Sequence, residues 1–444
     1  MKKVLVLGAG RSASTLIQYL MKEAEKENWQ ISVGDVDLEL AAKKIGKNPR
    51  GKAIVFDVNN ADQREKFVKE SDLVISLLPV HLHSIVARDC VHFKTHMVTA
   101  SYISTDMAAL DAVAKKEGLV LLNELGVDPG IDHMSAMKKI DEIKNKGGKL
   151  LSFKSYCGAL ISPEFNNIWG YKFTWAPKNV ILAGQGTAKY IKDGMVHFIP
   201  YNRLFLQTEK IDIPGFGKFE AYSNRDSLNY IEPYGLQEVP NLLRGTLRVP
   251  GYCEAWNAFI KIGLTDDTYR IRHSEKLTWN EFVFSYIEKI SGKTDVENLA
   301  WFLGESPESE IMKKLLWTGI LSNDKTGVEN GTPAEILLHL LEKKWKFEEG
   351  EIDMIVMQHQ FEYILNGKKT RCLSSMVVKG QDHLNTAISS TVGLPAAMGA
   401  KLILQGKIKE TGVLMPVTPD FYEPILAELE NYGVKFVEED ITID

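Results

Sequence analysis

One segment, residues 123–133, holds the residue types that can bind and activate a polar substrate. It reads Asn-Glu-Leu-Gly-Val-Asp-Pro-Gly-Ile-Asp-His, which places three carboxylates in one short loop. The loop follows an apolar run, residues 119–122, short enough for a buried strand, and precedes a predicted helix at 134–143. In α/β proteins, loops at the carboxyl ends of parallel strands bind ligands. The alternative is a charged turn whose Asp side chains cap the next helix.

A glycine-rich loop near the N-terminus is typical of a dinucleotide-binding site. A predicted strand at residues 3–7 leads into Gly-Ala-Gly-Arg-Ser-Ala and then into a predicted helix, which is the G-x-G-x-x-G/A pattern in its required context. The first glycine permits the tight turn, the second lets backbone amides approach a pyrophosphate, and the alanine takes the packing position. The helix N-terminus then faces the phosphate charge. The predicted cofactor contacts here are Gly8, Gly10, Arg11, Ser12 and Ala13.

Two acids that follow predicted strands extend this site. Asp35 ends the second strand, about 20 residues beyond the glycine loop, where a carboxylate contacts the adenosine ribose. Because a carboxylate accepts from the 2′-hydroxyl and repels a 2′-phosphate, we expect NAD to be favoured, with NADP as the possible alternative. Asp57 follows a third predicted strand, residues 53–56, and is predicted to lie beside the adenine.

Length and composition limit the class of protein. The chain has 444 residues, 44% hydrophobic and 25% charged, which predicts a globular protein of two or three domains. The net charge of −5 argues against nucleic acid as a partner. No apolar run approaches the roughly 20 residues that span a bilayer, so we expect no membrane segment. The four cysteines lie far apart, which predicts reduced thiols, a cytoplasmic location and no metal site.

Three regions with different patterns follow one another along the chain. Strands that alternate with helices predict a Rossmann-type, doubly wound parallel sheet over residues 1–130, an α/β fold. Residues 131–274 and about 346–379 predict a mixed α+β domain, and residues 275–345 a small helical domain that includes a capping box at Thr332 and Glu335. The C-terminal part, about 380–444, is predicted to return to the first domain.

Three polar clusters in the middle of the chain suit a substrate with carboxylates. They are Asn-Arg-Asp-Ser at residues 224–227, Arg-Gly-Thr-Leu-Arg at 244–248, and the segment 166–175. Arginine in such surroundings binds carboxylates through two parallel hydrogen bonds. The alternative for any one arginine is a solvated face or a surface ion pair.

These motifs resemble the saccharopine reductase family, the L-glutamate-forming saccharopine dehydrogenases. The matching segments are T-A-S-Y-I-S at 99–104, N-E-L-G-V-D-P-G-I-D-H at 123–133, S-Y-C-G at 155–158, G-Y-K-F-T-W at 170–175, N-R-D-S at 224–227 and R-G-T-L-R at 244–248. The resemblance covers essentially the whole chain. It implies a nucleotide-binding domain, a mixed-sheet substrate and dimerisation domain, a small helical domain, and an enzyme of lysine metabolism that works as a homodimer.

The resemblance also assigns site residues to this sequence. Leu78 and Pro79 would line the nicotinamide end of the cofactor site. The residues that would contact saccharopine are Ser101, Tyr102, Asp128, Arg225, Arg244, Thr246, Leu247 and Arg248.

The chain departs from the family pattern at three places. Fungal members carry a basic residue after the second strand, suited to NADP, where this chain has Gly34-Asp35-Val36-Asp37. They also have Ser where this chain has Ala176. The common R-Y-Q-G-F is replaced by Arg-Val-Pro-Gly-Tyr at 248–252, which would reshape the substrate pocket.

The chemistry of saccharopine predicts two roles for Asp128. The substrate is a secondary amine with three carboxylates, and its nitrogen must be neutral before hydride leaves the neighbouring carbon. Asp128 is the candidate base if burial, or a neighbouring acid such as Glu124 or Asp132, raises its pKa. Otherwise Asp128 orients the amine and water carries the protons. The competing functions are a reductase of another amine–carboxylate conjugate, such as a carboxylated polyamine, and a non-catalytic NAD-sensing regulator.

Overall fold

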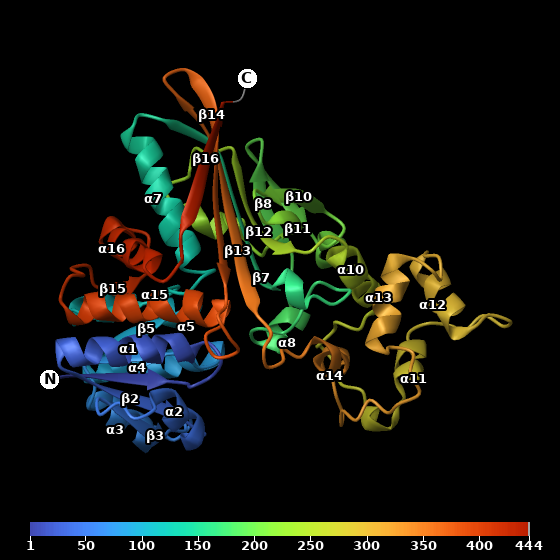
Figure 1. Cartoon of the computed structure of the whole chain (residues 1–444), viewed down its shortest axis with the longest axis horizontal. Helices are drawn as coiled ribbons and strands as arrows, with labels where there is room; N and C mark the ends of the chain where they lie inside the picture. Colours follow the sequence, from blue (N-terminus) through green and yellow to red (C-terminus); the bar gives the residue numbers. More distant parts are fainter. Residues whose placement is uncertain (443–444) are drawn as a thin grey trace. The chain divides into compact units, whose positions relative to one another are not determined.

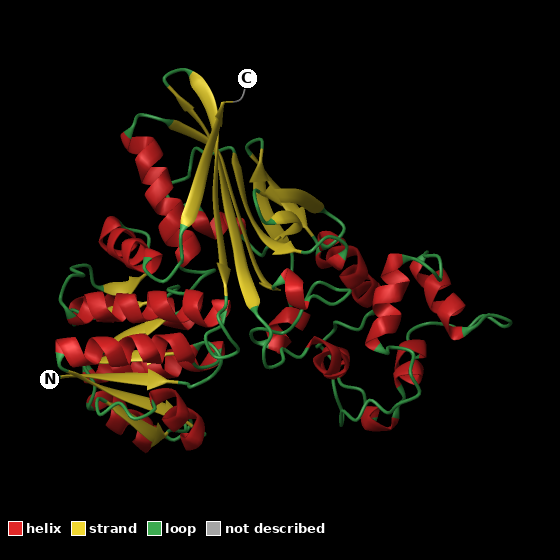
Figure 2. Ribbon diagram, viewed as in Figure 1, coloured by secondary structure: helices red, strands yellow, loops and turns green. Residues whose placement is uncertain are grey.

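The computed structural model describes residues 1–442 and divides into two compact units. The first unit consists of Met1–Leu150, Tyr363–Lys369 and Met376–Glu438. The second unit holds Leu151–Glu362 and Thr370–Ser375, together with the end of the chain from residue 439. Each unit contains its own sheet, as the secondary-structure colouring makes plain (Figure 2).

The first unit is built on a seven-stranded sheet in the order β15-β6-β5-β4-β1-β2-β3. Every neighbouring pair is parallel, so the predicted doubly wound parallel sheet is confirmed. Its central strands are continuous apolar runs because both faces are covered by helices. The strands are β1 (Lys2–Leu7), β2 (Trp29–Asp35), β3 (Gly51–Val55), β4 (Leu73–Ser76), β5 (His96–Thr99), β6 (Val120–Leu122) and β15 (Gly412–Leu414).

Helices from both ends of the chain cover this sheet. They are α1 (Ala13–Glu27), α2 (Leu38–Ile45), α3 (Ala61–Lys69), α4 (His83–Phe93), α5 (Thr105–Ala108), α6 (Asp111–Lys116), α7 (Ile131–Asn145), α15 (Ala387–Leu404) and α16 (Pro419–Glu430).

Helix α15, from the C-terminal part of the chain, lies beside α1 (Figure 1). The Oγ of Ser389 accepts a hydrogen bond from the backbone N–H of Thr15 at 3.1 Å. Gly393 permits the close approach, since a Cβ there would lie 3.0 Å from Ser12 O and Leu16 N. By length and composition alone α15 is apolar enough to cross a membrane, unlike what we expected from the sequence, but 78% of it is buried, as in the core helix of a globular protein.

The second unit contains most of a nine-stranded sheet with mixed strand directions. β12 pairs in parallel with β7, whereas β10, β11 and β12 pair antiparallel, which confirms the predicted mixed sheet. The main path is β10-β11-β12-β7-β13-β14-β16, and β8 joins β12. The strands are β7 (Lys149–Ile161), β8 (Ala188–Lys192), β9 (Met195–Ile199), β10 (Thr208–Ile213), β11 (Gly217–Ser223), β12 (Asn241–Arg248), β13 (Asp353–Leu365), β14 (Lys368–Lys379) and β16 (Phe436–Thr442).

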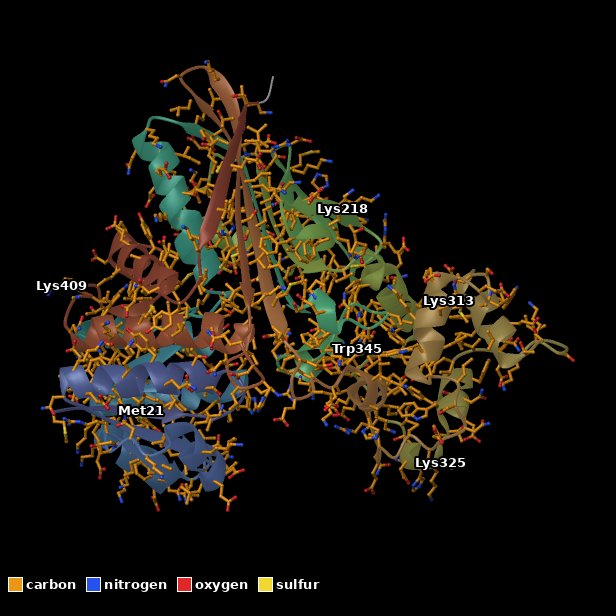
Figure 3. The ribbon with its side chains drawn as sticks, in the orientation of Figure 1. Met21, Lys218, Lys313, Lys325, Trp345 and Lys409 are labelled. Atoms are coloured by element: carbon orange, nitrogen blue, oxygen red, sulfur yellow. The ribbon has the colours of Figure 1, made fainter. Side chains whose placement is uncertain are left out.

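An aromatic cluster packs beside this sheet. Trp169 stacks on Phe259 with ring centroids 5.5 Å apart, and Trp345, labelled in Figure 3, contacts Trp169 at 5.2 Å. Tyr171 and Phe173 join the same cluster. The prediction that segment 166–175 is a polar substrate cluster is therefore wrong for its aromatic residues, because they are core side chains that pack against Phe259 and Trp345.

The remaining helices of the second unit lie between its strands in sequence. They are α8 (Pro177–Ile181), α9 (Tyr201–Leu204), α10 (Tyr252–Ile262), α11 (Trp279–Phe284), α12 (Asp295–Leu303), α13 (Glu310–Thr318) and α14 (Pro333–Trp345).

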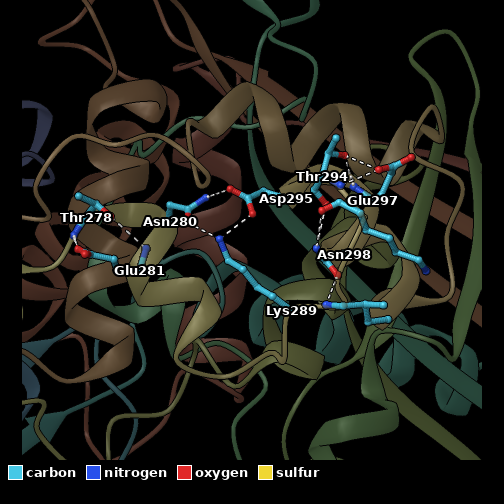
Figure 4. A network of polar contacts seen from close by, with 10 residues as sticks. Thr278, Asn280, Glu281, Lys289, Thr294, Asp295, Glu297 and Asn298 are labelled. Atoms are coloured by element: carbon cyan, nitrogen blue, oxygen red, sulfur yellow. Dashed lines mark hydrogen bonds and ion pairs between the residues drawn. The ribbon is translucent and has the colours of Figure 1, made fainter.

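Polar contacts fix the starts of the helices in segment 275–345. The predicted capping box of α14 is present at Thr332 and Glu335. Two further capping boxes start α11 at Thr278 and α12 at Thr294 (Figure 4). Lys289 Nζ donates to Asp295 Oδ1, in the first turn of α12, at 2.7 Å. By its contacts the segment belongs to the second unit. That it forms a domain of its own stays a prediction.

Candidate functional site

The loop between β1 and α1 has the form of a dinucleotide-binding loop. Gly8 has φ +97°, and a Cβ there would lie 3.1 Å from the carbonyl oxygen of Leu77. At Gly10 no atom lies within 4 Å of the place a Cβ would take, so the loop backbone is open to an approaching phosphate. Ser12 makes no side-chain cap at the start of α1. The residues present therefore fit the pyrophosphate of a nicotinamide dinucleotide.

Asp35 has a role in this loop that the sequence did not reveal. Its Oδ2 accepts from the backbone N–H of Ala9 at 2.7 Å, and its Oδ1 accepts from that of Asp37 at 3.0 Å. The carboxylate thus braces the glycine loop. Asp57 is exposed and caps its own turn, accepting from Asn59 N at 2.9 Å. Both acids lie at the carboxyl edge of the sheet, as predicted.

Lys44, on α2, brings a positive charge to the same loop. Its Nζ donates to Ser14 Oγ at 2.8 Å and to the carbonyl oxygen of Gly10. Burial lowers the pKa of Lys44 to about 8, and the nearby Asp35 opposes this shift. This contact could not be predicted, because helical spacing on α2 does not reveal which residue reaches the loop.

The carboxyl ends of β4 and β5 carry a buried histidine between hydroxyl groups. His83, in the first turn of α4, has Nδ1 2.8 Å from Ser76 Oγ and Nε2 2.8 Å from Ser101 Oγ. Thr99 Oγ1 lies 3.4 Å from the same Nε2. Leu78 and Pro79, the predicted nicotinamide contacts, follow β4 directly. His83 was not among the predicted site residues, because its partners Ser76 and Ser101 belong to other elements that only the folded chain brings to it.

The acidic loop is tightly built around its glycines. Gly130 has φ +142°, and a Cβ there would lie only 2.1 Å from Gly126 O, so no other residue fits. Asp128 Oδ1 accepts a hydrogen bond from Tyr102 Oη at 3.3 Å, which brings two of the predicted substrate residues together. The loop is thus both a tight turn and a set of polar groups at the sheet edge.

The two carboxylates expected to act on Asp128 have other assigned partners. Glu124 Oε2 lies 2.9 Å from Nε2 of the buried His133, and Glu124 Oε1 accepts from Ile103 N at 3.0 Å. Asp132 Oδ1 accepts from Gly130 N at 2.6 Å. Both side chains therefore stabilise the loop. The Glu124–His133 pair is a feature that sequence reasoning missed.

In the second unit, β12 presents three predicted residues on one face. Side chains alternate along a strand, so Arg244, Thr246 and Arg248 share a face. Leu247 points to the opposite face and is fully buried, which leaves only its backbone on the predicted substrate side. The guanidinium of Arg244 lies 4.1 Å from the ring centroid of Tyr230 and donates to its hydroxyl.

Arg248 is a buried cation within a cage of tyrosines. Its guanidinium carbon lies 5.1, 5.7 and 5.2 Å from the ring centroids of Tyr171, Tyr222 and Tyr252, and its side chain is 3% exposed. Nη1 donates to Leu247 O at 2.9 Å, whereas Nε has no hydrogen-bond partner in residues 1–442. Burying a cation in this way is costly unless an anion pairs with it. The position therefore suits a substrate carboxylate.

Arg225 lies in a turn beside these residues. Asn224 N donates to Arg244 O at 2.7 Å, and Lys189 N donates to Arg225 O at 2.8 Å. Arg225 is exposed and has φ +51°, a left-handed backbone conformation. The predicted arginines thus come together within the second unit. No group of three His, Cys, Asp or Glu side chains spaced for a metal occurs in the described part of the chain.

Comparison with known families covers nearly the whole chain. Residues 4–122 match the saccharopine dehydrogenase NADP binding domain, and residues 126–434 match the saccharopine dehydrogenase C-terminal domain.

Individual relatives agree with these matches. The chain is 35% identical over 450 residues to saccharopine dehydrogenase [NADP(+), L-glutamate-forming] of Saccharomyces cerevisiae, covering 99% of both chains. It is 35% identical to the mitochondrial alpha-aminoadipic semialdehyde synthase of Bos taurus, covering 98% of this chain and 47% of that protein. The apo saccharopine dehydrogenase (L-Glu forming) structure from Saccharomyces cerevisiae superposes with a TM-score of 0.88 and 33% identity, over 99% of this chain and 100% of that one.

These findings contradict the expected preference for NAD. The matching domain is an NADP-binding domain, and the fungal relatives are named as NADP(+) enzymes. The prediction was wrong because it assigned the Asp35 carboxylate to a ribose, whereas that carboxylate accepts two backbone hydrogen bonds. Sequence spacing also could not show that Lys44 adds a positive charge at the glycine loop.

Proposed function

The chain belongs to the saccharopine dehydrogenase family, and on this premise we propose that it oxidises saccharopine to glutamate and aminoadipate semialdehyde, or runs the reverse reaction. It is an oxidoreductase of the class that acts on a CH–NH group. The observation that carries the choice of substrate is Arg248, a buried guanidinium whose Nε has no partner in residues 1–442. A substrate with several carboxylates supplies the missing anion.

The second unit supplies the groups that recognise carboxylates. Saccharopine carries three carboxylates, and the second unit has three arginines to bind them. Arg244 and Arg248 lie on β12, and Arg225 lies in the neighbouring turn. The aromatic faces around Arg248 keep water away from its guanidinium, which strengthens its attraction for an anion. Thr246 lies between two of these arginines on the same face of β12 and adds a hydroxyl.

The first unit supplies the groups that act on the amine. Ser101, Tyr102 and Asp128 lie near the carboxyl ends of β5 and β6. Asp128, with Tyr102 donating to its carboxylate, either takes the proton from the secondary ammonium or orients the amine while water carries the proton. Loss of hydride from the carbon beside the nitrogen gives an imine, and addition of water to that imine releases glutamate and the semialdehyde.

NADP fits the glycine loop as the cofactor. Gly8, Gly10, Ser12 and Ala13 would surround its pyrophosphate, with Arg11 and Lys44 as the nearby cations, and Leu78 and Pro79 would face its nicotinamide. A bound nicotinamide accepts the hydride. The residues named here would position the nicotinamide and supply the charges around the cofactor.

Turnover of saccharopine by the purified protein tests this function. We expect NADP⁺ to be reduced in equal amount to the glutamate formed, with NADP⁺ preferred over NAD⁺. A carboxylated polyamine, added in place of saccharopine, serves as the competing substrate. The proposal fails if this compound is oxidised and saccharopine is not, or if both dinucleotides bind and neither substrate reduces them.

We also propose that the protein is a homodimer that associates through the second unit. Large apolar side chains are exposed on and near the β8–β9 hairpin: Met195 is 64%, Phe198 62% and Leu206 59% exposed. Exposed apolar patches of this kind are typical of protein interfaces. Analytical ultracentrifugation should find a dimer for the native chain and a monomer for Phe198→Asp, and a native monomer would refute the proposal.

A further inference from the structure

We propose that His83 is a positioning residue that fixes the direction of the Ser101 hydroxyl, so that Ser101 presents a hydrogen-bond acceptor to the N–H of the substrate amine. The inference rests on the proposed function, because it takes saccharopine as the ligand of Ser101. All of its participants lie in the first unit.

The geometry places one buried ring between three hydroxyl groups. Ser76 Oγ, at the end of β4, lies 2.8 Å from Nδ1. Ser101 Oγ lies 2.8 Å and Thr99 Oγ1 lies 3.4 Å from Nε2. The ring is 4% exposed, so the protein itself must satisfy both nitrogens.

The hydrogen bonds indicate which nitrogen carries the proton. Burial, aided by the nearby His81, lowers the pKa of His83 to about 4, so the ring is neutral at physiological pH and has one donor and one acceptor. Thr99 Oγ1 already accepts from Ser101 N at 3.3 Å, and its own proton points most simply to Nε2. Because the hydroxyl groups of Ser101 and Thr99 both approach Nε2, we assign Nε2 as the acceptor and Nδ1–H as the donor to Ser76 Oγ.

This tautomer determines what Ser101 can offer. The hydroxyl proton of Ser101 is directed at Nε2, which leaves the oxygen lone pairs for an incoming N–H. Because Nε2 already accepts the proton of Ser101, it has no free lone pair for the proton of the amine. His83 therefore orients Ser101 and does not remove the proton.

Conservative variants separate positioning from a general structural role. The amide of Gln reaches the place of Nε2 and keeps the bond to Ser101, whereas the shorter amide of Asn reaches only the place of Nδ1. We expect His83→Asn to raise the KM for saccharopine roughly three- to tenfold, the range of one neutral hydrogen bond. His83→Gln should stay close to the native KM. The affinity for NADPH, measured by its fluorescence, should not change in either variant.

A double-mutant cycle with Ser101→Ala is the deciding measurement. If His83 acts through Ser101, His83→Asn adds nothing to the KM of Ser101→Ala. His92→Asn, a histidine near the other end of α4 and exposed, is the matched control and should behave as the native enzyme. Ser76→Ala keeps the ring but removes the group that holds its proton on Nδ1, so that the proton can move to Nε2. This variant should also raise the KM, and it serves if His83→Asn does not fold. The amide oxygen of His83→Gln is an acceptor without such a partner.

The outcomes are distinct. Three results would each overturn the inference. The first is a KM in the double variant that equals the product of the effects of His83→Asn and Ser101→Ala. The second is an equal rise in KM in His83→Asn and His83→Gln, and the third is an unchanged KM in Ser76→Ala. Native enzyme that oxidises saccharopine in the same assay would leave the proposed function standing in all three cases. Native enzyme without saccharopine turnover would instead refute the proposed function.

Discussion

The buried cation Arg248 ties substrate binding to the stability of the second unit. Three tyrosine faces and one carbonyl oxygen are its assigned partners. We expect Arg248→Met to raise the KM for saccharopine roughly 10- to 100-fold, since a charge-assisted hydrogen bond contributes about 1.5–3 kcal/mol. The melting temperature should stay the same or rise, because an apolar side chain of similar length removes the cost of burying the charge.

Steady-state kinetics and thermal unfolding on the same preparation test this prediction. Arg371→Met is the control, because Arg371 pairs with Glu362 at 3.0 Å on β13 and β14, away from β12. An unchanged KM in Arg248→Met would show that this arginine does not bind the substrate.

Substitution of Asp128 tests whether this residue removes the proton from the amine or only orients the amine. If it is the base, Asp128→Asn should lower kcat about 10²- to 10⁴-fold, the usual contribution of general base catalysis. Tyr102→Phe removes the donor 3.3 Å from Asp128 Oδ1 and should have a smaller effect. Turnover under saturating saccharopine gives kcat directly. An unchanged kcat with weaker binding would assign Asp128 to orientation of the amine.

At the scale of single elements, the capping boxes fix where the helices of segment 275–345 begin. Thr332 Oγ1 accepts from Glu335 N at 3.2 Å, and Glu335 Oε2 accepts from Thr332 N at 3.1 Å. We expect Thr332→Ala to destabilise the protein by about 1 kcal/mol, the usual value of an N-cap. Urea unfolding measures this loss. Thr332→Ser keeps the hydroxyl and should restore most of the stability, and equal losses in both variants would contradict a capping role.

For the first unit as a whole, cofactor binding depends on a helix from the far end of the chain. Gly393 of α15 packs on Ser12 and Leu16 at the start of α1, next to the glycine loop. Gly393→Val should push α1 out of place, destabilise the unit by about 1–3 kcal/mol, and weaken NADP⁺ binding about tenfold. Isothermal titration with NADP⁺ measures the affinity.

Gly399→Val is the matched control on the same helix. A Cβ there would meet the side chains of Leu125 and Leu122 and not α1, so stability should fall while NADP⁺ affinity is kept. Equal losses of affinity in the two variants would mean that overall destabilisation, and not the position of α1, weakens cofactor binding.

Local patterns made several features predictable. The glycine loop, the strand before it and the helix after it are contiguous, so the α/β sheet follows from spacing alone. The capping box at Thr332 is equally local. The start of α15 was not predictable in the same way: the helix begins at Ala387, after its N-cap Thr386. The apolar run alone did not reveal that cap.

The amino-acid sequence by itself determined the fold class, the family motifs and the identity of the arginines and acids that could do chemistry, because these depend on neighbours in the chain. The tertiary structure decided how those groups are used. Asp35 braces a loop, Glu124 pairs with His133, Trp169 and Tyr171 become core, and His83 meets Ser101. Each of these outcomes depends on burial and on partners brought from other elements. The spacing of residues along the chain does not reveal burial or these partners, although both determine the free energy of a buried polar group.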